Sequence, residues 1–115
     1  AIAQGGSNVS CGQKQRLSIA RAVYRHPEIL IFDDSFSALD FKTDREVRDA
    51  LAREAKDSTK LIVAQRIGTI MNADRIVVLD DGKVVGQGTH KELLDNCDVY
   101  RQIAESQLSQ AELTA

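Results

Sequence analysis

Two adjacent carboxylates, Asp33 and Asp34, directly follow an apolar run from Ile29 to Phe32. The run has the length and composition of a buried strand, and open α/β sheets place their ligands at the carboxyl ends of their strands. A carboxylate there is suited to Mg²⁺ beside the phosphates of a nucleotide. Asp33 is therefore a candidate magnesium ligand. The alternative is that Asp33 only caps the turn after the strand.

A second candidate site precedes this strand, at residues Ser10 to Gln13. Ser10 and Gln13 have the spacing of a capping box, which predicts that a helix starts near Cys11. The free N–H groups and partial positive charge of a helix N-terminus suit a phosphate, and Ser10 and Gly12 are small enough to let an anion approach. On spacing alone the simple capping role is favoured, because capping boxes are common.

One helix and one strand must position these groups. We predict a helix from Cys11 to Tyr24, because Pro27 pushes the residue before it out of the helical region. We predict a strand from Ile29 to Phe32 and expect it to be covered on both faces, because it is apolar throughout. The apolar residues that share one face of the helix are Leu17, Ala20, Val23 and Tyr24.

The rest of the chain alternates helical patterns with short apolar runs, which indicates an α/β sheet that is mostly parallel. Thr43 with Glu46, and Thr89 with Glu92, form capping boxes, and Asp81-Gly82 is typical of a two-residue hairpin. The predicted elements are a helix from about Thr43, strands at Lys60–Ala64, Arg75–Leu79 and Lys83–Gly86, a short helix near Thr69, a helix opened by Thr89, and a helix from Val99 to about Leu108.

The composition is that of an ordinary globular domain. The chain has 115 residues, of which 43% are hydrophobic, and this is enough for one core. Its net charge of −2 gives no electrostatic basis for binding nucleic acid or an anionic membrane surface. Cys11 and Cys97 have neither metal nor redox spacing, which favours a reducing, cytosolic setting. We expect no membrane-spanning segment and no signal peptide.

Several segments together resemble the ATP-binding-cassette (ABC) ATPases. Residues Val9 to Gln13 are similar to the LSGGQ signature of that family, and Lys14-Gln15-Arg16 continues it in the usual way. Ile29 to Asp33 is similar to the Walker B strand, and Ser37-Ala38-Leu39-Asp40 matches the D-loop. Ala64-Gln65-Arg66 occupies the position of the switch (H-loop). One such match would be weak, but the ordered set covers nearly the whole chain.

The resemblance implies where a nucleotide would bind. In this family the signature binds the γ-phosphate of ATP held by the partner subunit, so Ser10, Gly12 and Gln13 would act in trans. Asp33 would hold Mg²⁺. The other residues that the resemblance places at the nucleotide are Cys11, Ser37, Ala38 and Asp40.

Two departures from the family pattern point in the same direction. Asp34 stands where a glutamate normally polarises the attacking water, and its side chain is shorter by one carbon–carbon bond, about 1.5 Å. A misplacement of about 1 Å can cost roughly a hundredfold in rate, so Asp34 should be a poor general base. Gln65 stands where the family usually has histidine, and its amide cannot become cationic near pH 7. We therefore predict a degenerate site that hydrolyses ATP slowly, although Gln65 alone could be an ordinary surface residue.

Cys11 and the two histidines receive no firm role. Cys11 replaces a glycine of the family pattern, and helical dihedrals at that position accept a Cβ without strain, so tolerated variation is favoured. The sharper alternative is that a thiol reagent on Cys11 blocks nucleotide-driven closure. We expect His26 to place a favourable charge at a helix end and His90 to be solvated.

A P-loop motif is missing from the sequence. Gly82-Lys83 is not preceded by the first glycine of the G-x-x-x-x-G-K motif, and it belongs to the hairpin. By resemblance, the missing strand would lie between Lys60–Ala64 and Arg75–Leu79, which would leave a gap in the sheet and unpaired strand edges. We predict that the isolated chain binds ATP weakly or not at all and is marginally stable.

The resemblance implies an α/β fold: the three-layer, RecA-like core of P-loop NTPases, truncated and without its P-loop strand. Residues 1–115 would be the C-terminal part of an ABC nucleotide-binding domain, from the signature helix and Walker B through the D-loop and switch loop to the C-terminal helices. Val84 to Leu94 resembles the exporter branch, in which transmembrane helices usually precede this domain on one polypeptide.

The implied function is ATP binding and hydrolysis that powers export at the cytoplasmic face of the cell membrane. Its cofactors would be ATP and Mg²⁺. Its partners would be transmembrane domains and a second ABC nucleotide-binding domain in a heterodimer, with no nucleic acid. One alternative is a soluble ABC ATPase associated with chromosomes or translation. Another is a non-catalytic binding module whose ATP site is purely structural.

Overall fold

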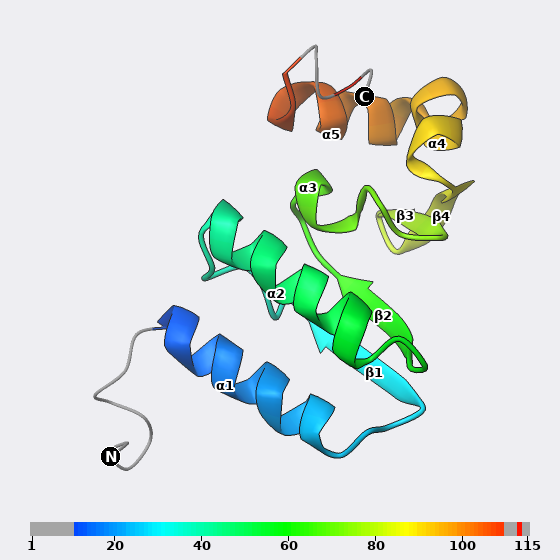
Figure 1. The fold of residues 1–115 in the computed structure, drawn as a ribbon. Helices are drawn as coiled ribbons and strands as arrows, with labels where there is room; N and C mark the ends of the chain where they lie inside the picture. Colours follow the sequence, from blue (N-terminus) through cyan, green and yellow to red (C-terminus); the bar gives the residue numbers. More distant parts are fainter. Residues whose placement is uncertain (1–10, 110–112, 114–115) are drawn as a thin grey trace. The chain divides into compact units, whose positions relative to one another are not determined.

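A computed structural model describes residues 11–109 and residue 113. The chain forms two units that divide between Gln65 and Arg66. The elements of the first unit are α1 (Cys11–Tyr24), β1 (Ile29–Asp33), α2 (Phe41–Glu54) and β2 (Thr59–Val63) (Figure 1). Those of the second unit are α3 (Ile67–Ile70), β3 (Ile76–Asp80), β4 (Lys83–Gly88), α4 (His90–Asn96) and α5 (Asp98–Gln107).

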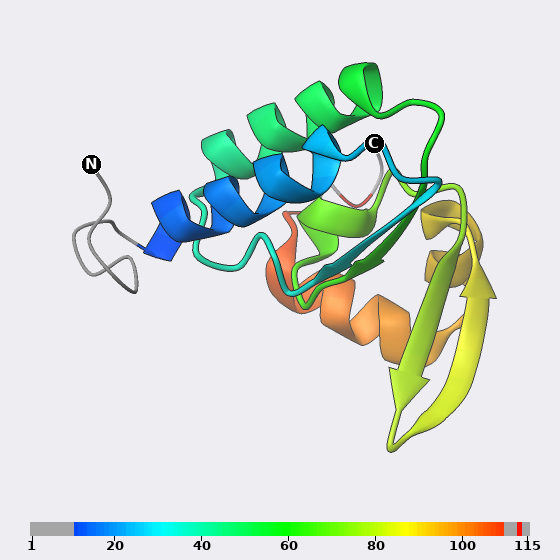
Figure 2. The same ribbon diagram turned by 90° about the horizontal axis from the view of Figure 1, so that it is seen from below.

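In the first unit, two helices cover one face of a parallel strand pair. β1 and β2 are in parallel register from Ile29 opposite Thr59 to Asp33 opposite Val63. Both views show α1 and α2 side by side on the same side of these strands (Figures 1 and 2). The core between the helices and β1 consists of Ile19, Leu30, Phe32, Phe36, Leu39, Leu51 and Ala55.

The predicted helix from Cys11 to Tyr24 is confirmed, but the expected burial of the following strand is only half right. Leu30 and Phe32 are buried, whereas Ile29 is 62% exposed and Ile31 is 65% exposed. Successive side chains of a strand point to opposite faces, and α1 and α2 of this unit cover only one of these faces. Within the first unit, β1 therefore has an apolar face that no helix of that unit covers.

The start of α2 differs from the prediction. The helix begins at Phe41, and its N-cap is Asp40, whose carboxylate accepts a hydrogen bond of 2.7 Å from the N–H of Thr43. That backbone hydrogen bond holds the pKa of the Asp40 carboxyl below its ordinary value. Thr43 and Glu46 do not form the predicted capping box, because an aspartate three residues earlier is an equally strong N-cap.

The second unit contains the predicted hairpin. β3 and β4 pair antiparallel, and the turn residues Asp81 (φ 50°) and Gly82 (φ 74°) both have the positive φ that a two-residue type I′ turn requires. The described strands thus form one parallel and one antiparallel pair, so the expectation of a mostly parallel sheet is not met. β2 and β3 belong to separate sheets.

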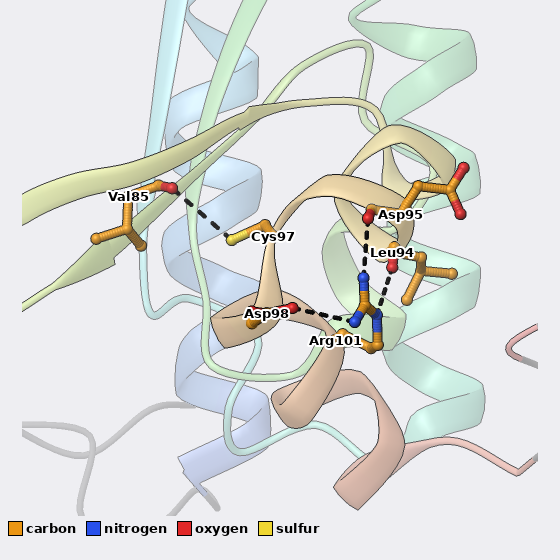
Figure 3. Close-up of polar contacts among 6 residues, drawn as sticks. All are labelled: Val85, Leu94, Asp95, Cys97, Asp98 and Arg101. Carbon is orange, nitrogen blue, oxygen red and sulfur yellow. Dashed lines mark hydrogen bonds and ion pairs between the residues drawn. The ribbon is translucent and has the colours of Figure 1, made fainter.

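The predicted cap of α4 is confirmed, and an arginine closes its other end. Thr89 and Glu92 form both hydrogen bonds of a capping box. Arg101 in α5 donates to the carbonyl oxygens of Leu94 (2.6 Å) and Asp95 (2.8 Å) and to the Asp98 carboxylate (3.0 Å) (Figure 3). These carbonyls belong to the last turn of α4, where the helix itself supplies no donor. Arg101 therefore fixes the turn between α4 and α5.

Gly86 in β4 lies against Cys97, whose thiol also faces the carbonyl oxygen of Val85 at 3.9 Å (Figure 3). A Cβ added to Gly86 would lie 2.8 Å from the Cys97 Sγ and 3.1 Å from the Leu93 Cδ2. We expect Gly86→Ala to destabilise this unit by about 1–3 kcal/mol, because overpacking forces a well-packed core to shift.

Thermal unfolding of the full-length protein checks this expectation. Cys97→Ala in the same chain should remove part of the clash, so the double variant should be more stable than the sum of the two single effects. Gly68→Ala is the matched control, since a Cβ at Gly68 meets nothing within 4 Å. Equal melting temperatures for Gly86→Ala and Gly68→Ala would contradict the packing account.

The expectation that His90 is solvated is wrong. His90 is 5% exposed, and its Nδ1 lies 2.6 Å from the hydroxyl oxygen of Tyr100, which is itself buried in α5. Its Nε2 has no hydrogen-bond partner among the described residues. Burial lowers the pKa of His90 and raises the pKa of Tyr100 to about 12. The sequence pattern missed this because the fold of α4 onto α5 turns a first-turn position inward.

This burial predicts that the second unit loses stability in mild acid. The pKa of His90 is depressed in the folded state, so below its unfolded pKa of about 6.5 the unfolded chain takes up a proton that the folded chain resists. The contribution of neutral His90 to stability is fully present above the unfolded pKa and is lost as the pH falls from there to the depressed pKa of the folded state. Thermal unfolding of the full-length protein from pH 7.5 to 5 should show a smaller acid-induced fall in melting temperature for His90→Gln than for wild type. Parallel curves would contradict this.

Candidate functional site

The two candidate carboxylates lie at the carboxyl end of β1. Asp33 is the last residue of the strand and pairs with Val63, and Asp34 follows it. The N–H of Asp34 donates to the carbonyl oxygen of Val63 over 2.9 Å, and both aspartates are exposed. Gln65 follows the end of β2, and parallel strands end at the same edge of a sheet. The structure therefore brings Asp33, Asp34 and Gln65 to one edge of the first unit.

Asp34 has an unusual backbone conformation. Its φ is 55°, in the left-handed region that few residues other than glycine adopt, although aspartate tolerates it better than most. Such conformations persist only where the surroundings hold them, and they are concentrated at functional sites. Its N–H is held by β2, and its carbonyl oxygen accepts hydrogen bonds from two side chains, Gln15 and Ser37.

Gln15 joins α1 to the turn after β1. Its Nε2 donates to the Asp34 carbonyl oxygen at 3.2 Å and to the Ser37 Oγ at 3.1 Å. Its Oε1 accepts from the N–H of Ala38 at 2.9 Å. The Ser37 hydroxyl in turn donates to the Asp34 carbonyl oxygen at 3.2 Å. Sequence reasoning assigned Gln15 no role of its own, because no local pattern reports contacts made across so many intervening residues.

The first turn of α1 lies against the same segment. A Cβ added to Gly12 would lie 3.1 Å from the carbonyl oxygen of Ala38 and 3.6 Å from the Leu39 Cδ2. Gly12 therefore allows a close approach between the helix and the turn, in addition to the room for an anion that the sequence suggested. The N-terminal part of α1 and the acidic turn form one connected surface.

Two buried residues anchor residues 35–40. Phe36 is 2% exposed and Leu39 is 4% exposed, and the Phe36 ring packs against Phe32 with a centroid separation of 5.5 Å. The residues between and after them, Ser37, Ala38 and Asp40, are exposed. The alternation holds the turn in place while it leaves the polar groups accessible. Asp40 is committed to capping α2, as described above.

Only some of the residues that the sequence placed at the phosphate lie within the described part of the chain. Ser10 lies outside the described residues, as does the side chain of Cys11. Gln13 is exposed on α1. The predicted Ser10–Gln13 capping box is therefore untested.

The carboxylates at this edge suit a magnesium ion that takes its remaining ligands from a nucleotide. Mg²⁺ keeps several waters and is bound through one or two carboxylates together with substrate phosphates. Among the described residues, no group of three or more histidine, cysteine or acidic side chains could hold a metal without such a ligand. A hollow of about 370 Å³ lies elsewhere, between α1 and the start of β1, lined in part by Arg21, Arg25 and Ile29.

Comparison with known proteins gives this arrangement a family. The model of the ABC transporter family matches residues 1–37. An ABC transporter ATP-binding protein of Mycobacterium tuberculosis is 52% identical over 106 residues, which cover 92% of this chain and 18% of that protein. The ABC multidrug transporter MDR2 of Trichophyton rubrum is 50% identical over 98 residues, covering 85% of this chain and 7% of that protein. This chain belongs to the ABC transporter ATP-binding family.

Solved structures agree with this assignment. A bacterial Atm1-family ABC exporter with ATP bound matches with a TM-score of 0.85 and 36% identity, covering 91% of this chain and 18% of that one. The fold is therefore the α/β fold of P-loop NTPases, as the sequence predicted. The chain spans 18% of the length of the mycobacterial relative. Within the described part of the chain, no helix is long and apolar enough to cross a bilayer.

Proposed function

We propose that this ABC chain is the C-terminal part of a nucleotide-binding domain and that it contributes two different half-sites to a pair of such domains. One is the acidic edge at Asp33, Asp34 and Gln65, which faces the nucleotide held by its own domain. The other is the N-terminal end of α1, at Ser10, Cys11, Gly12 and Gln13, which grips the γ-phosphate of ATP held by the partner domain.

One observation carries this proposal: the helix end and the acidic edge are joined by hydrogen bonds into one surface. Gln15 of α1 bonds the backbone of Asp34 and Ala38, and Gly12 lies against Ala38. A helix N-terminus offers donors to a phosphate, and strand-end carboxylates offer ligands to Mg²⁺. A surface that carries both suits a nucleotide bound between two domains. Ser37, Ala38 and Asp40 line the segment between the two half-sites.

The half-site at the acidic edge is a slow one in this proposal. Asp34 has a shorter side chain than the glutamate usual for the family, and Gln65 replaces the usual histidine, so neither residue supports fast activation of water. The partner's site, which receives the helix end with Ser10, Gly12 and Gln13, would carry out most hydrolysis. This asymmetry favours a heterodimer over a pair of identical chains.

Transport is the use of ATP that the comparisons favour. The relatives named above are transporter proteins, and the matching structure is an exporter. We propose that ATP binding closes the domain pair and drives alternating access in transmembrane domains, at the cytoplasmic face of a membrane. The relatives named above favour neither the soluble, non-transport ABC alternative nor the purely structural module.

ATP hydrolysis by the full-length assembly, with each site disabled in turn, tests this function. Disabling the partner's site should remove most of the activity, and disabling this chain's own site should leave most of it. Equal losses would contradict the asymmetry, and absence of ATP binding at both sites would contradict the function.

A further inference from the structure

The amide of Gln15 uses both its ends in contacts with the turn after β1. Nε2 donates to the carbonyl oxygen of Asp34 and to Ser37 Oγ, and Oε1 accepts from the N–H of Ala38, with distances of 2.9–3.2 Å. A glutamine amide offers an acceptor oxygen and two N–H donors, and both the oxygen and the NH₂ group are used on this one segment. These contacts cross 19 to 23 residues of sequence.

The contacts of Gln15 hold the turn at Asp34, whose backbone has an unfavourable conformation. Asp34 has a φ of 55°, and its carbonyl oxygen is held by Gln15 and by Ser37, which Gln15 also holds. Gln15 lies one turn beyond Gly12 on α1, so it is rigidly connected to the helix end. A movement of α1 along or about its axis must therefore pull on the backbone of Asp34 and Ala38.

We propose that Gln15 is a positioning residue that couples the two half-sites of this chain. It ties the helix that serves the partner's ATP to the turn that carries the carboxylate at this chain's own ATP. Engagement of the helix end by a γ-phosphate then orders Asp34, and the arrangement of Asp34 in turn affects the helix end, because coupling between two sites is reciprocal. This proposal rests on the proposed function.

The competing explanation is that the three hydrogen bonds of Gln15 only stabilise the turn. In that case Gln15 variants would loosen the turn without changing how fast the assembled transporter hydrolyses ATP. The two explanations therefore predict different values of kcat. Hydrogen exchange at the N–H of Ala38 reports separately whether the hydrogen bonds of Gln15 are lost.

The test uses the full-length protein assembled with its partner and three variants. Gln15→Ala removes all three contacts. Gln15→Glu has nearly the same shape and can still accept from Ala38, but it cannot donate to Asp34 or Ser37. Ser18→Ala is the matched control at an exposed position on α1 outside the signature.

Hydrogen exchange at Ala38 and steady-state ATPase kinetics are measured on each assembly with the partner's site disabled, so that the remaining hydrolysis reports on the site at Asp34. We expect Gln15→Ala to lose protection at Ala38 and to lower kcat by about tenfold with little change in KM, because a small misplacement of a reacting group costs rate more than binding. Gln15→Glu should keep the protection but still lower kcat. Ser18→Ala should match wild type in both measurements.

Wild-type kcat in both Gln15 variants would overturn the coupling role, whether or not Ala38 loses protection. If Gln15→Ala fails to assemble, Gln15→Glu decides the question alone. A failure of the proposed function would look different, because the wild-type assembly would then show no ATPase activity at all.

Discussion

Replacing Asp34 by Glu together with Gln65 by His is expected to raise ATP turnover at this chain's own site by roughly a hundredfold. The longer carboxylate would reach the attacking water, and the imidazole would add a group that titrates near neutral pH. Asp34 is exposed, so a further methylene meets no packed neighbour. A glutamate adopts a φ of 55° less readily than an aspartate does. The hydrogen bonds from Gln15 and to Val63 nevertheless hold the backbone of residue 34 in place.

This gain is measured in the full-length assembly with the partner's site disabled, so that the remaining hydrolysis reports on the site at Asp34. Asp49→Glu, at an exposed position on α2, is the control for adding a methylene to an aspartate elsewhere. Each single substitution should give a smaller gain than the pair. Turnover that stays at the wild-type level in the double variant would show that the acidic edge is not limited by these two side chains.

Gly12→Asp is expected to lower ATP hydrolysis at the partner's site by about a hundredfold, on the scale of the loss of one hydrogen-bond donor to a developing negative charge. Two effects act together. The new Cβ would lie 3.1 Å from the backbone oxygen of Ala38, which cannot move aside as a flexible side chain could. The new carboxylate would also repel the γ-phosphate that we place at this helix end.

The assay is ATPase activity of the assembled pair, with ATP binding measured in parallel. Gly12→Ala separates the two effects, because it brings the Cβ without the charge and should cost less. Gly68→Asp is the matched control, at a helical glycine where an added Cβ has open space. Full activity of Gly12→Asp would show that α1 does not face a phosphate.

The sequence predicted the elements that have strong local signals. The helix from Cys11 to Tyr24, the Asp81-Gly82 hairpin and the Thr89 capping box are all set by residues within a few positions of each other. Where two local signals compete, as Asp40 and Thr43 do at the start of α2, spacing alone cannot say which residue caps the helix. The correct edge for Asp33 and Asp34 also followed from the sequence, because it depends only on strand direction.

Other features depend on contacts between distant segments. The burial of His90 is set by Tyr100 on the next helix, and the exposure of Ile29 and Ile31 is set by which face the helices cover. Gln15 is the clearest example at the site. Nothing in its neighbourhood distinguishes it from other helix-surface glutamines, and only the folded turn shows that its amide holds Asp34, Ser37 and Ala38.

The most direct test of the account is a structure of the full-length assembly with ATP and Mg²⁺ bound. We expect the N-terminal amides of α1, at Gly12 and Gln13, to face the γ-phosphate of the nucleotide held by the partner domain. We also expect Asp34 to stop short of the water at this chain's own nucleotide. A structure in which the start of α1 is turned away from every phosphate would contradict it.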